Sequence, residues 1–248
     1  MRTVYIMWIR QLKRYWRSKP RMFGSLAQPI LFLVALGFGF GPIFQKAGGG
    51  NYIDFLAPGV IAMSILFTAV FTGIEVIWDR QFGFLKETLV APVPRFKIMI
   101  GRTLGGATVA TLQGIVVFLI CLLIGFRPDN WTMLPLAIVF MFLIATLFTS
   151  MGTAIASRLN DMQAFPLIIN FLIMPIFFLS GSLFPLDGLP GVIETIAKIN
   201  PLSYGVDGLR YAFTGISHFN IWLDFGVVLI VALVINLIGT YMFSKIEI

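Results

Sequence analysis

Six long apolar runs, each of about 20 residues or more, limit what this chain can fold into. They extend from Phe23 to Phe44, Phe55 to Trp78, Ile100 to Phe126, Trp131 to Ala156, Ala164 to Phe184 and Ile221 to Phe243. A helix of about 20 residues crosses the hydrocarbon core of a bilayer, which is about 30 Å thick. The sequence therefore predicts an all-α integral membrane protein with six transmembrane helices, and its 58% apolar content excludes an ordinary soluble domain.

The positions of arginine and lysine predict the orientation of this protein in the membrane. With six spans, both termini lie on one side, and only four of the 18 cationic residues fall on the other side: Lys46, Arg127, Lys198 and Arg210. Because cytoplasmic loops carry the excess of these residues, we expect both termini in the cytoplasm. The net charge of +7 then faces anionic headgroups, so membrane lipids are expected partners and nucleic acid is not.

The N-terminal segment from Met1 to Pro20 has the pattern of a helix that lies in the cytoplasmic interface. One face carries apolar and aromatic residues, and the opposite face carries cations that would point into water. The apolar face is formed by Val4, Tyr5, Trp8, Leu12, Tyr15 and Trp16, and the cationic face by Arg10, Lys13, Arg14 and Arg17. A disordered basic tail is the alternative, although such tails lack an aromatic stripe.

Residues 79–97, between the second and third runs, form a cytoplasmic loop with its own amphipathic pattern. Phe82, Leu85 and Leu89 make an apolar ridge at helical spacing, with Phe84 to one side. Proline disfavours helical geometry in the residue before it, so the sequence Ala91-Pro92-Val93-Pro94 ends the helix. We expect a short helix from Arg80 to Leu89 that inserts into a groove on a soluble partner, with charges from Arg80, Lys86 and Glu87. A loop resting on lipid is the alternative.

Residues 185–220 are apolar, broken by proline and glycine, and too short for two further spans. Val192, Ile193, Ile196 and Ile199 recur at helical spacing, as do Leu202, Val206, Leu209 and Phe213. Two half-length helices that dip into the outer leaflet and return fit this pattern. A pair of helices lying flat on the outer surface fits it as well. Residues 1–248 are expected to form a single membrane domain, with no internal duplication.

The chemical motifs of an enzyme or a metal site are absent. The sequence contains neither G-x-x-x-x-G-K-[ST] nor H-E-x-x-H, and His218 is its only histidine. A metal cluster of histidine and cysteine cannot be assembled from one histidine and the single Cys121. We therefore expect no catalytic residue, no metal and no cofactor in this chain.

A few polar residues interrupt the predicted spans, where they are candidates for function. Glu75 is either a gate or substrate contact, or a structural partner of Arg80 or Arg102. Three polar side chains within the spans, Gln113, Asn170 and Asn236, are better explained by hydrogen bonds between helices than by the lining of a translocation path. Asn170 is also kept as a candidate for that lining. No file of carboxylates crosses the membrane, which disfavours a proton-coupled secondary transporter.

Three motifs connect these predictions with a known family. They are Asp79-Arg80-Gln81-Phe82-Gly83-Phe84-Leu85-Lys86-Glu87-Thr88-Leu89, the segment Ser182-Leu183-Phe184-Pro185-Leu186, and Asn200-Pro201-Leu202-Ser203-Tyr204-Gly205-Val206-Asp207-Gly208-Leu209-Arg210. With the six spans, they resemble the permease subunits of ATP-binding cassette transporters of the type-2 exporter class. The likeness covers essentially the whole chain and is strongest to the drug and lipid exporter branch.

The resemblance implies a function and its partners. It implies export of an amphipathic substrate (a drug, lipid or glycolipid) across a prokaryotic cytoplasmic membrane, and a separate ATPase subunit that holds ATP and Mg²⁺. It also implies a second permease chain, expected to be identical to this one. It assigns coupling to the ATPase to Arg80, Phe82, Phe84, Leu85, Lys86, Glu87 and Leu89, and the re-entrant motif to Asn200, Pro201, Tyr204, Asp207 and Arg210. It also places the cargo near spans one, two and five. A polysaccharide or lipo-oligosaccharide permease, or a stand-alone secondary transporter, is the alternative.

Overall fold

The described part of the chain in the computed structural model, residues 2–46, 50–85, 90, 93–159, 161–186 and 190–246, is helical and contains no strand. This confirms the predicted all-α class. Its elements are α1 (Arg2–Arg17), α2 (Lys19–Lys46), α3 (Tyr52–Phe71), α4 (Ile74–Gln81), α6 (Arg95–Ile124), the 3₁₀ turn η1 (Trp131–Met133), α7 (Leu134–Arg158), α8 (Ala164–Phe178), α9 (Gly191–Ile199), α10 (Pro201–Thr214) and α11 (Ile221–Ser244).

Five of the helical segments are long and apolar enough to cross a membrane, by length and composition. They are Lys19–Lys46, Tyr52–Gln81, Arg95–Ile124, Trp131–Arg158 and Ile221–Ser244, and they match five of the six predicted spans. The run from Ala164 to Phe184 was expected to be helical throughout, which is wrong: α8 ends at Phe178. Gly181 then takes a φ of +70°, which favours glycine and leaves the helical conformation. A sixth crossing through α8 therefore stays a prediction.

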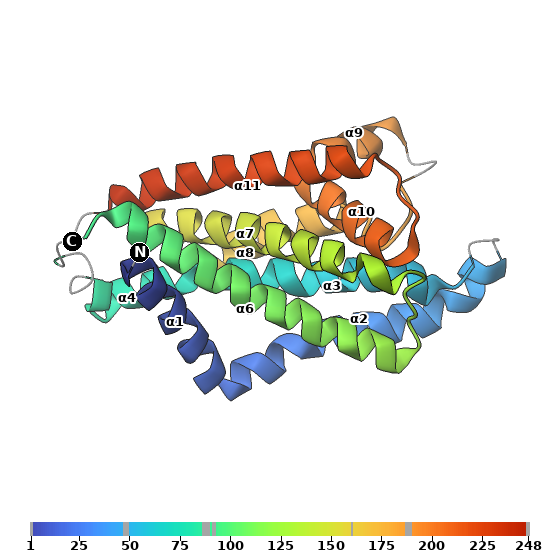
Figure 1. The fold of residues 1–248 in the computed structure, drawn as a ribbon, viewed down its shortest axis with the longest axis horizontal. Coiled ribbons are helices and arrows are strands. Elements are labelled where there is room, and N and C mark those ends of the chain that lie inside the picture. Colours follow the sequence, from blue (N-terminus) through green and yellow to red (C-terminus); the bar gives the residue numbers. More distant parts are fainter. Residues whose placement is uncertain are drawn as a thin grey trace.

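The helices form an elongated bundle with both chain termini at one end, called here the terminal end, and α9 and α10 at the other, the α10 end (Figure 1). The central helix is α3, which packs against α2, α6, α7 and α10 and has nearly all of its residues buried. Gly73, between α3 and α4, approaches the backbone of Gly152 in α7 so closely that a Cβ atom would overlap it. The outer helices α2 and α11 are mostly exposed.

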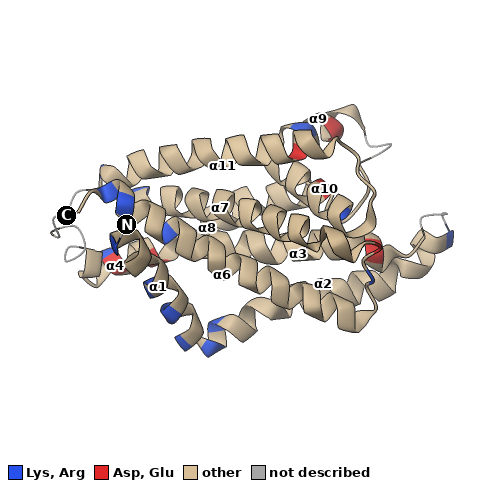
Figure 2. Ribbon diagram, viewed as in Figure 1, with Lys and Arg blue, Asp and Glu red and all other residues tan. Residues whose placement is uncertain are grey.

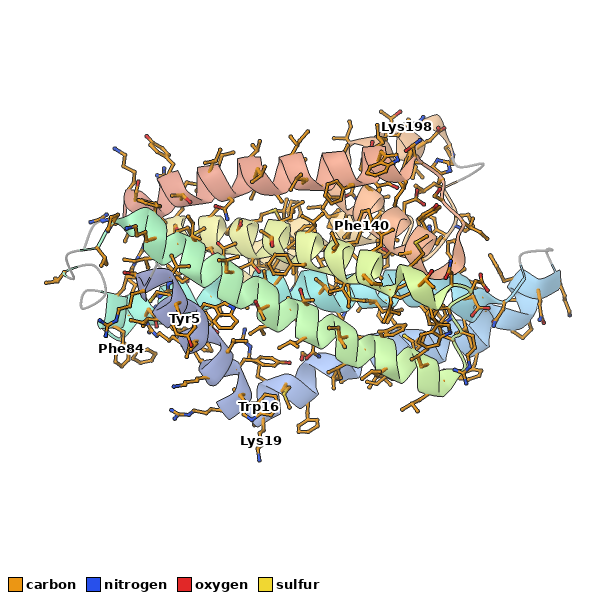
Figure 3. All side chains as sticks on the ribbon, in the orientation of Figure 1. Tyr5, Trp16, Lys19, Phe84, Phe140 and Lys198 are labelled. Atoms are coloured by element: carbon orange, nitrogen blue, oxygen red, sulfur yellow. The ribbon has the colours of Figure 1, made fainter. Side chains whose placement is uncertain are left out.

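The predicted N-terminal helix is present as α1, but its buried face differs from the prediction. The buried residues are Met7, Gln11 and Tyr15, whereas Tyr5 and Trp16 are exposed (Figure 3). The reason is that α1 has a protein neighbour: it packs along α6, where two glycines, Gly101 and Gly105, leave room for Met7 and Gln11. The contact with α6 sets the rotation of α1 about its own axis, and therefore which side chains are buried. The periodicity of the sequence contains no information about this neighbour, so it did not identify the buried face.

The predicted pair of half-length helices is confirmed as α9 and α10, within residues 185–220. Most residues of α10 are buried against α3, α7 and α11, whereas Ala197 is the one buried residue of α9. The two helices therefore have different roles in the bundle, since α10 is part of its core and α9 covers its edge. Whether they enter the outer leaflet stays a prediction.

Candidate functional site at the terminal end

Two acidic residues of α4 meet four arginines at the terminal end of the bundle. Glu75 and Asp79 lie four positions apart, so both carboxylates project from the same face of the helix. Both side chains are buried, which disfavours their charged forms unless cations compensate them. The local fold places them there because α4 follows the close approach of Gly73 to α7.

The arginines come from three other helices. Asp79 accepts hydrogen bonds from Arg102 of α6 and, at 3.1 and 3.2 Å, from Arg10 and Arg14 of α1. Glu75 accepts a 2.8 Å hydrogen bond from Arg21 of α2, and its second oxygen lies 3.6 Å from Arg14. We call these six residues (Arg10, Arg14, Arg21, Glu75, Asp79 and Arg102) the ion network. It joins α1, α2, α4 and α6 through side chains alone.

The ion network corrects two expectations. In the structural reading of Glu75 its predicted partner was Arg80 or Arg102, but its partners are Arg21 and Arg14. The reading of Glu75 as a gate or substrate contact stays a prediction. Arg10 and Arg14 were expected to point into water, but they turn toward Asp79 because a buried carboxylate needs donors. The sequence did contain a signal for this site, since two acids at helical spacing ended an apolar run next to a basic segment.

Cations exceed anions in the ion network, since four guanidinium groups surround two carboxylates. Figure 2 shows that Lys and Arg gather on α1 and around its junction with α2. An open groove of about 840 Å³ lies beside the network and is lined by Lys13, Arg17 and Phe84 among others. The terminal end therefore presents positive charge to whatever lies next to it.

The predicted helix from Arg80 to Leu89 is wrong at its start. Arg80 and Gln81 belong to α4, which ends at Gln81. Gly83 then has a φ of +79°, so the helical conformation does not continue through it. The side chain of Arg80 donates to the main-chain oxygens of Ser157 (3.0 Å) and Leu159 (3.2 Å), at the carboxyl end of α7. Cations are favoured there because helix-terminal carbonyls lack partners within the helix. Arg80 therefore ties α4 to α7.

The apolar ridge of this segment is also divided by the turn. Phe82 is 70% exposed, whereas Leu85 is 2% exposed and belongs to the core of the bundle. Phe84 is exposed at the terminal end, as Figure 3 shows. Phe82 and Leu85 thus do not share one face. The remaining predicted coupling residues, Lys86, Glu87 and Leu89, lie outside the described residues.

The predicted re-entrant motif joins three segments at the α10 end. The Asn200 side-chain oxygen accepts from Leu202 N at 3.0 Å and caps α10, while its nitrogen donates to Ile176 O of α8 at 2.6 Å. Pro201 occupies the first turn of α10, where its missing N–H leaves no hydrogen bond unmade. Tyr204 donates to Lys198 O at 2.7 Å, so α9 is held to α10.

The two charged residues of the motif, Asp207 and Arg210, bind two different segments of the chain next to α10. Asp207 is buried and accepts from the backbone N–H groups of His218 and Phe219, at 2.7 to 2.9 Å, in the loop before α11. Arg210 donates to Gly181 O at 2.8 Å, and its guanidinium lies 4.2 Å from the centre of the Phe55 ring. All these partners are structural, which favours a role in holding the α10 end together.

The other polar candidates separate into buried and exposed residues. Gln113 accepts a hydrogen bond from Tyr15 of α1, and Asn236 of α11 donates to Ser150 of α7 at 3.0 Å. These contacts confirm the predicted hydrogen bonds between helices. Burial raises the pKa of Tyr15, which keeps its hydroxyl protonated as the donor. Asn170 instead lies exposed on α8, beside the exposed Leu167 and Phe171.

A metal site is not formed by the described residues, since within those ranges no three His, Cys, Asp or Glu side chains come together. What the ion network can do is mechanical and electrostatic. It connects α4, and through it the exposed Phe82 and Phe84, to α1, α2 and α6.

Comparison with known proteins agrees with this architecture. Residues 2–214 match the ABC-2 type transporter family. The chain is 29% identical to Nodulation protein J of Rhizobium leguminosarum bv. viciae, over 90% of this chain and 86% of that protein. It is 27% identical to the putative transport permease ycf38 of Cyanophora paradoxa, over 91% of this chain and 82% of that protein. It is 26% identical to the inner membrane transport permease YadH of Escherichia coli K12, over 90% of this chain and 88% of that protein. The chain therefore belongs to the ABC-2 type transporter family, as its motifs predicted.

Proposed function

We propose that this chain is the membrane-spanning subunit of an exporter that moves an amphipathic substrate out of the cytoplasm, driven by a separate ATPase subunit that holds ATP and Mg²⁺. Membership of the ABC-2 type transporter family supports this reading, as do relatives that are transport permeases by name. In this proposal the terminal end faces the cytoplasm of a prokaryotic cell. The gathering of Lys and Arg at that end supports the orientation.

The ion network is the observation that carries the coupling role. The segment that follows Gln81 emerges at the terminal end, and α4 directly before it is bound to α1, α2 and α6 through Glu75 and Asp79. Arg80 adds a connection to α7. A force applied to the segment by an ATPase would therefore be distributed to four membrane-associated helices. Phe82 and Phe84 are exposed there and would contact the partner.

A second copy of this chain is also part of the proposal. The outer faces of α2 and α8 are exposed and apolar, with Phe38, Leu167 and Phe171 among their exposed side chains. Asn170 interrupts the α8 face with a polar group that lipid cannot satisfy. Pairing of two permease chains through these faces would cover Asn170, and cargo would pass between the copies.

The proposed function is tested by reconstituting the purified chain in liposomes with and without its ATPase subunit. We expect no ATP hydrolysis by the chain alone, and ATP-dependent movement of an amphipathic dye only in the complex. Transport by the chain without the ATPase would contradict the proposal and favour a secondary transporter.

The coupling residues are tested by charge reversal. Lys86→Glu combined with Glu87→Lys is expected to lower capture of the ATPase subunit by about tenfold, as the loss of charged contacts at an interface does. Lys46→Glu, a charge reversal at the exposed last residue of α2, is the control. Equal capture by the reversed variant and the control would remove this segment from the coupling site.

A further inference from the structure

A cavity of about 370 Å³ lies between α1, α2, α3 and α4, on the inner side of the ion network. Its volume is within the range of sites for small molecules. Arg21 and Trp78 line it near the terminal end, and Pro29 and Met63 line it deeper in the bundle. From Arg21 to Pro29 the helix rises about 12 Å, so the cavity extends from the membrane edge into the apolar region.

The cavity has polar groups without partners. Ser64 is 2% exposed, lines the cavity, and has no hydrogen-bond partner for its hydroxyl. Trp78 also lines the cavity, and its buried indole nitrogen has no hydrogen-bond partner either. A buried donor without an acceptor is unfavourable by about 1–3 kcal/mol, so a polar atom supplied at this wall of the cavity would stabilise both residues.

The remainder of the wall is largely apolar, although Tyr15, Ser25, Gln28 and Thr68 also line the cavity. Phe67, Phe71 and Ile74 follow one side of α3 and α4, opposite Pro29 of α2. Aromatic and aliphatic side chains of this kind accommodate a hydrocarbon chain or a fused ring. The cavity is therefore amphipathic along its length, with its charged end at the terminal end of the bundle.

The charge of the ligand follows from the ion network. Arg21 lines the cavity and shares Glu75 with Arg14, and the guanidinium of Arg14 lies 5.5 Å from the centre of the Trp78 ring. The network as a whole has two more cations than anions. Arginine binds phosphate and carboxylate through paired N–H donors, so an anionic group would complete the charge balance.

We propose that this cavity binds an anionic amphiphile from the cytoplasmic leaflet, with its phosphate or carboxylate at Arg21 and Trp78 and its apolar part between Pro29 and Phe71. The inference rests on the proposed function in that it names the class of cargo and the place where it is loaded. Ser64 donates to an ester or hydroxyl oxygen below the headgroup. Zwitterionic amphiphiles bind more weakly because their own cation meets the excess of arginines.

The test uses phosphatidylglycerol with a photoreactive diazirine in its acyl chain, and phosphatidylcholine with the same chain. The purified chain is placed in lipid nanodiscs with either probe, illuminated, and mapped by peptide mass spectrometry. Because α3 is buried in the bundle, labelling of its residues 63–71 reports the cavity rather than the outer surface. We expect the anionic probe to label this stretch more than the zwitterionic one.

Two variants with matched controls locate the site. Arg21→Gln is expected to reduce anionic labelling of residues 63–71 by about tenfold, the effect of losing a charged hydrogen bond. Lys19→Gln makes the same charge change at an exposed residue that points away from the bundle (Figure 3), and is expected to leave labelling unchanged. Arg21→Lys, which keeps the charge that Glu75 needs, is expected to restore part of it.

The second variant adds bulk at the cavity wall. Gly24 lines the cavity, and a Cβ atom there would meet no other atom within 4 Å, so Gly24→Phe is compatible with the fold and is expected to reduce labelling. Gly39→Phe is the control, since Gly39 also lies on α2 with open space around it and does not line the cavity. Equal labelling in these two variants would overturn the proposal.

The remaining outcomes are distinct. Equal labelling by the two lipids would overturn the anionic assignment, and complete competition by inorganic phosphate would overturn the assignment to an amphiphile. The experiment contains no ATPase subunit and no ATP. Selective labelling without ATP-driven transport in the complex would therefore keep the site and reject the proposed function, whereas transport without selective labelling would do the reverse.

Discussion

The two ends of the bundle hold their buried charges in different ways. At the terminal end, Glu75 and Asp79 are compensated by arginines from three other helices, through pairs of side chains. At the α10 end, Asp207 and Arg210 bond mainly to backbone groups of the neighbouring loop and turn. Pairs of long side chains can exchange partners while the helices move, whereas bonds to backbone atoms hold segments in one place. The difference is that helices are joined to one another by ion pairs at the terminal end, whereas a loop and a turn are held to α10 at the other end.

The largest effect is expected from Asp79→Asn. It leaves the guanidinium of Arg102, whose side chain is 3% exposed, without its charged partner. Loss of one member of a buried ion pair is expected to lower the free energy of unfolding by about 3–5 kcal/mol. Thermal denaturation of the purified chain in detergent measures this loss.

The control for this variant is Asp161→Asn, an exposed carboxylate that can still accept its hydrogen bond from Gln163 N. The double variant Asp79→Leu with Arg102→Leu removes both charges and is expected to recover part of the stability. If Asp79→Asn unfolds like Asp161→Asn, then burial of the network does not contribute as proposed, and the contrast between the two ends fails.

An intermediate effect is expected from Asp207→Asn at the α10 end. The new amide oxygen can take the place of Oδ2, which already accepts from both His218 N and Phe219 N, but these two hydrogen bonds lose their charge assistance and the bond from His218 N to Oδ1 is lost. The expected loss is about 1–3 kcal/mol, confined to the loop before α11. Hydrogen exchange at these two amides measures it, with the exposed Glu194→Gln of the same end as the control. Unchanged exchange would show that Asp207 does not fasten this loop.

The smallest effect is the difference between two helix caps. Asn200 caps α10 and Asn220 caps α11 with nearly equal hydrogen bonds, of 3.0 and 2.9 Å, but only Asn200 also donates to Ile176 O. Either change to Ala is expected to cost about 1 kcal/mol for the cap. Asn200→Ala should cost about 1 kcal/mol more, for the bond to α8. Denaturation midpoints of the two variants measure this difference, and equal midpoints would mean that the tie to α8 adds nothing.

Much of the fold follows from sequence pattern because each long apolar run forms a helix on its own. The runs at Ile100 to Phe126 and Ile221 to Phe243 correspond closely to α6 and α11, whose backbone groups are satisfied within the helix. The half-length helices α9 and α10 were predicted in the same way from apolar spacing and from Pro201. Local propensity and periodicity are sufficient at these places.

The site was harder to predict because it depends on which helices become neighbours. Glu75 was recognised as a buried acid, but its partner Arg21 lies 54 positions away in another helix. Arg80 was assigned to a partner-facing helix because Phe82 and Leu85 have the spacing of one helical face. In the structure, the turn at Gly83 separates these two residues. Contacts between distant segments leave no periodic signal in one sequence.

The amino-acid sequence by itself determined that this protein is a bundle of apolar helices with a charged interruption after α4, and its motifs identified the family. Only the tertiary structure decided that α4, directly before this interruption, is held by four arginines, and that an amphipathic cavity lies beside them. The physical reason is that helix formation depends on bonds within a segment, whereas burial of charge depends on partners that packing brings together.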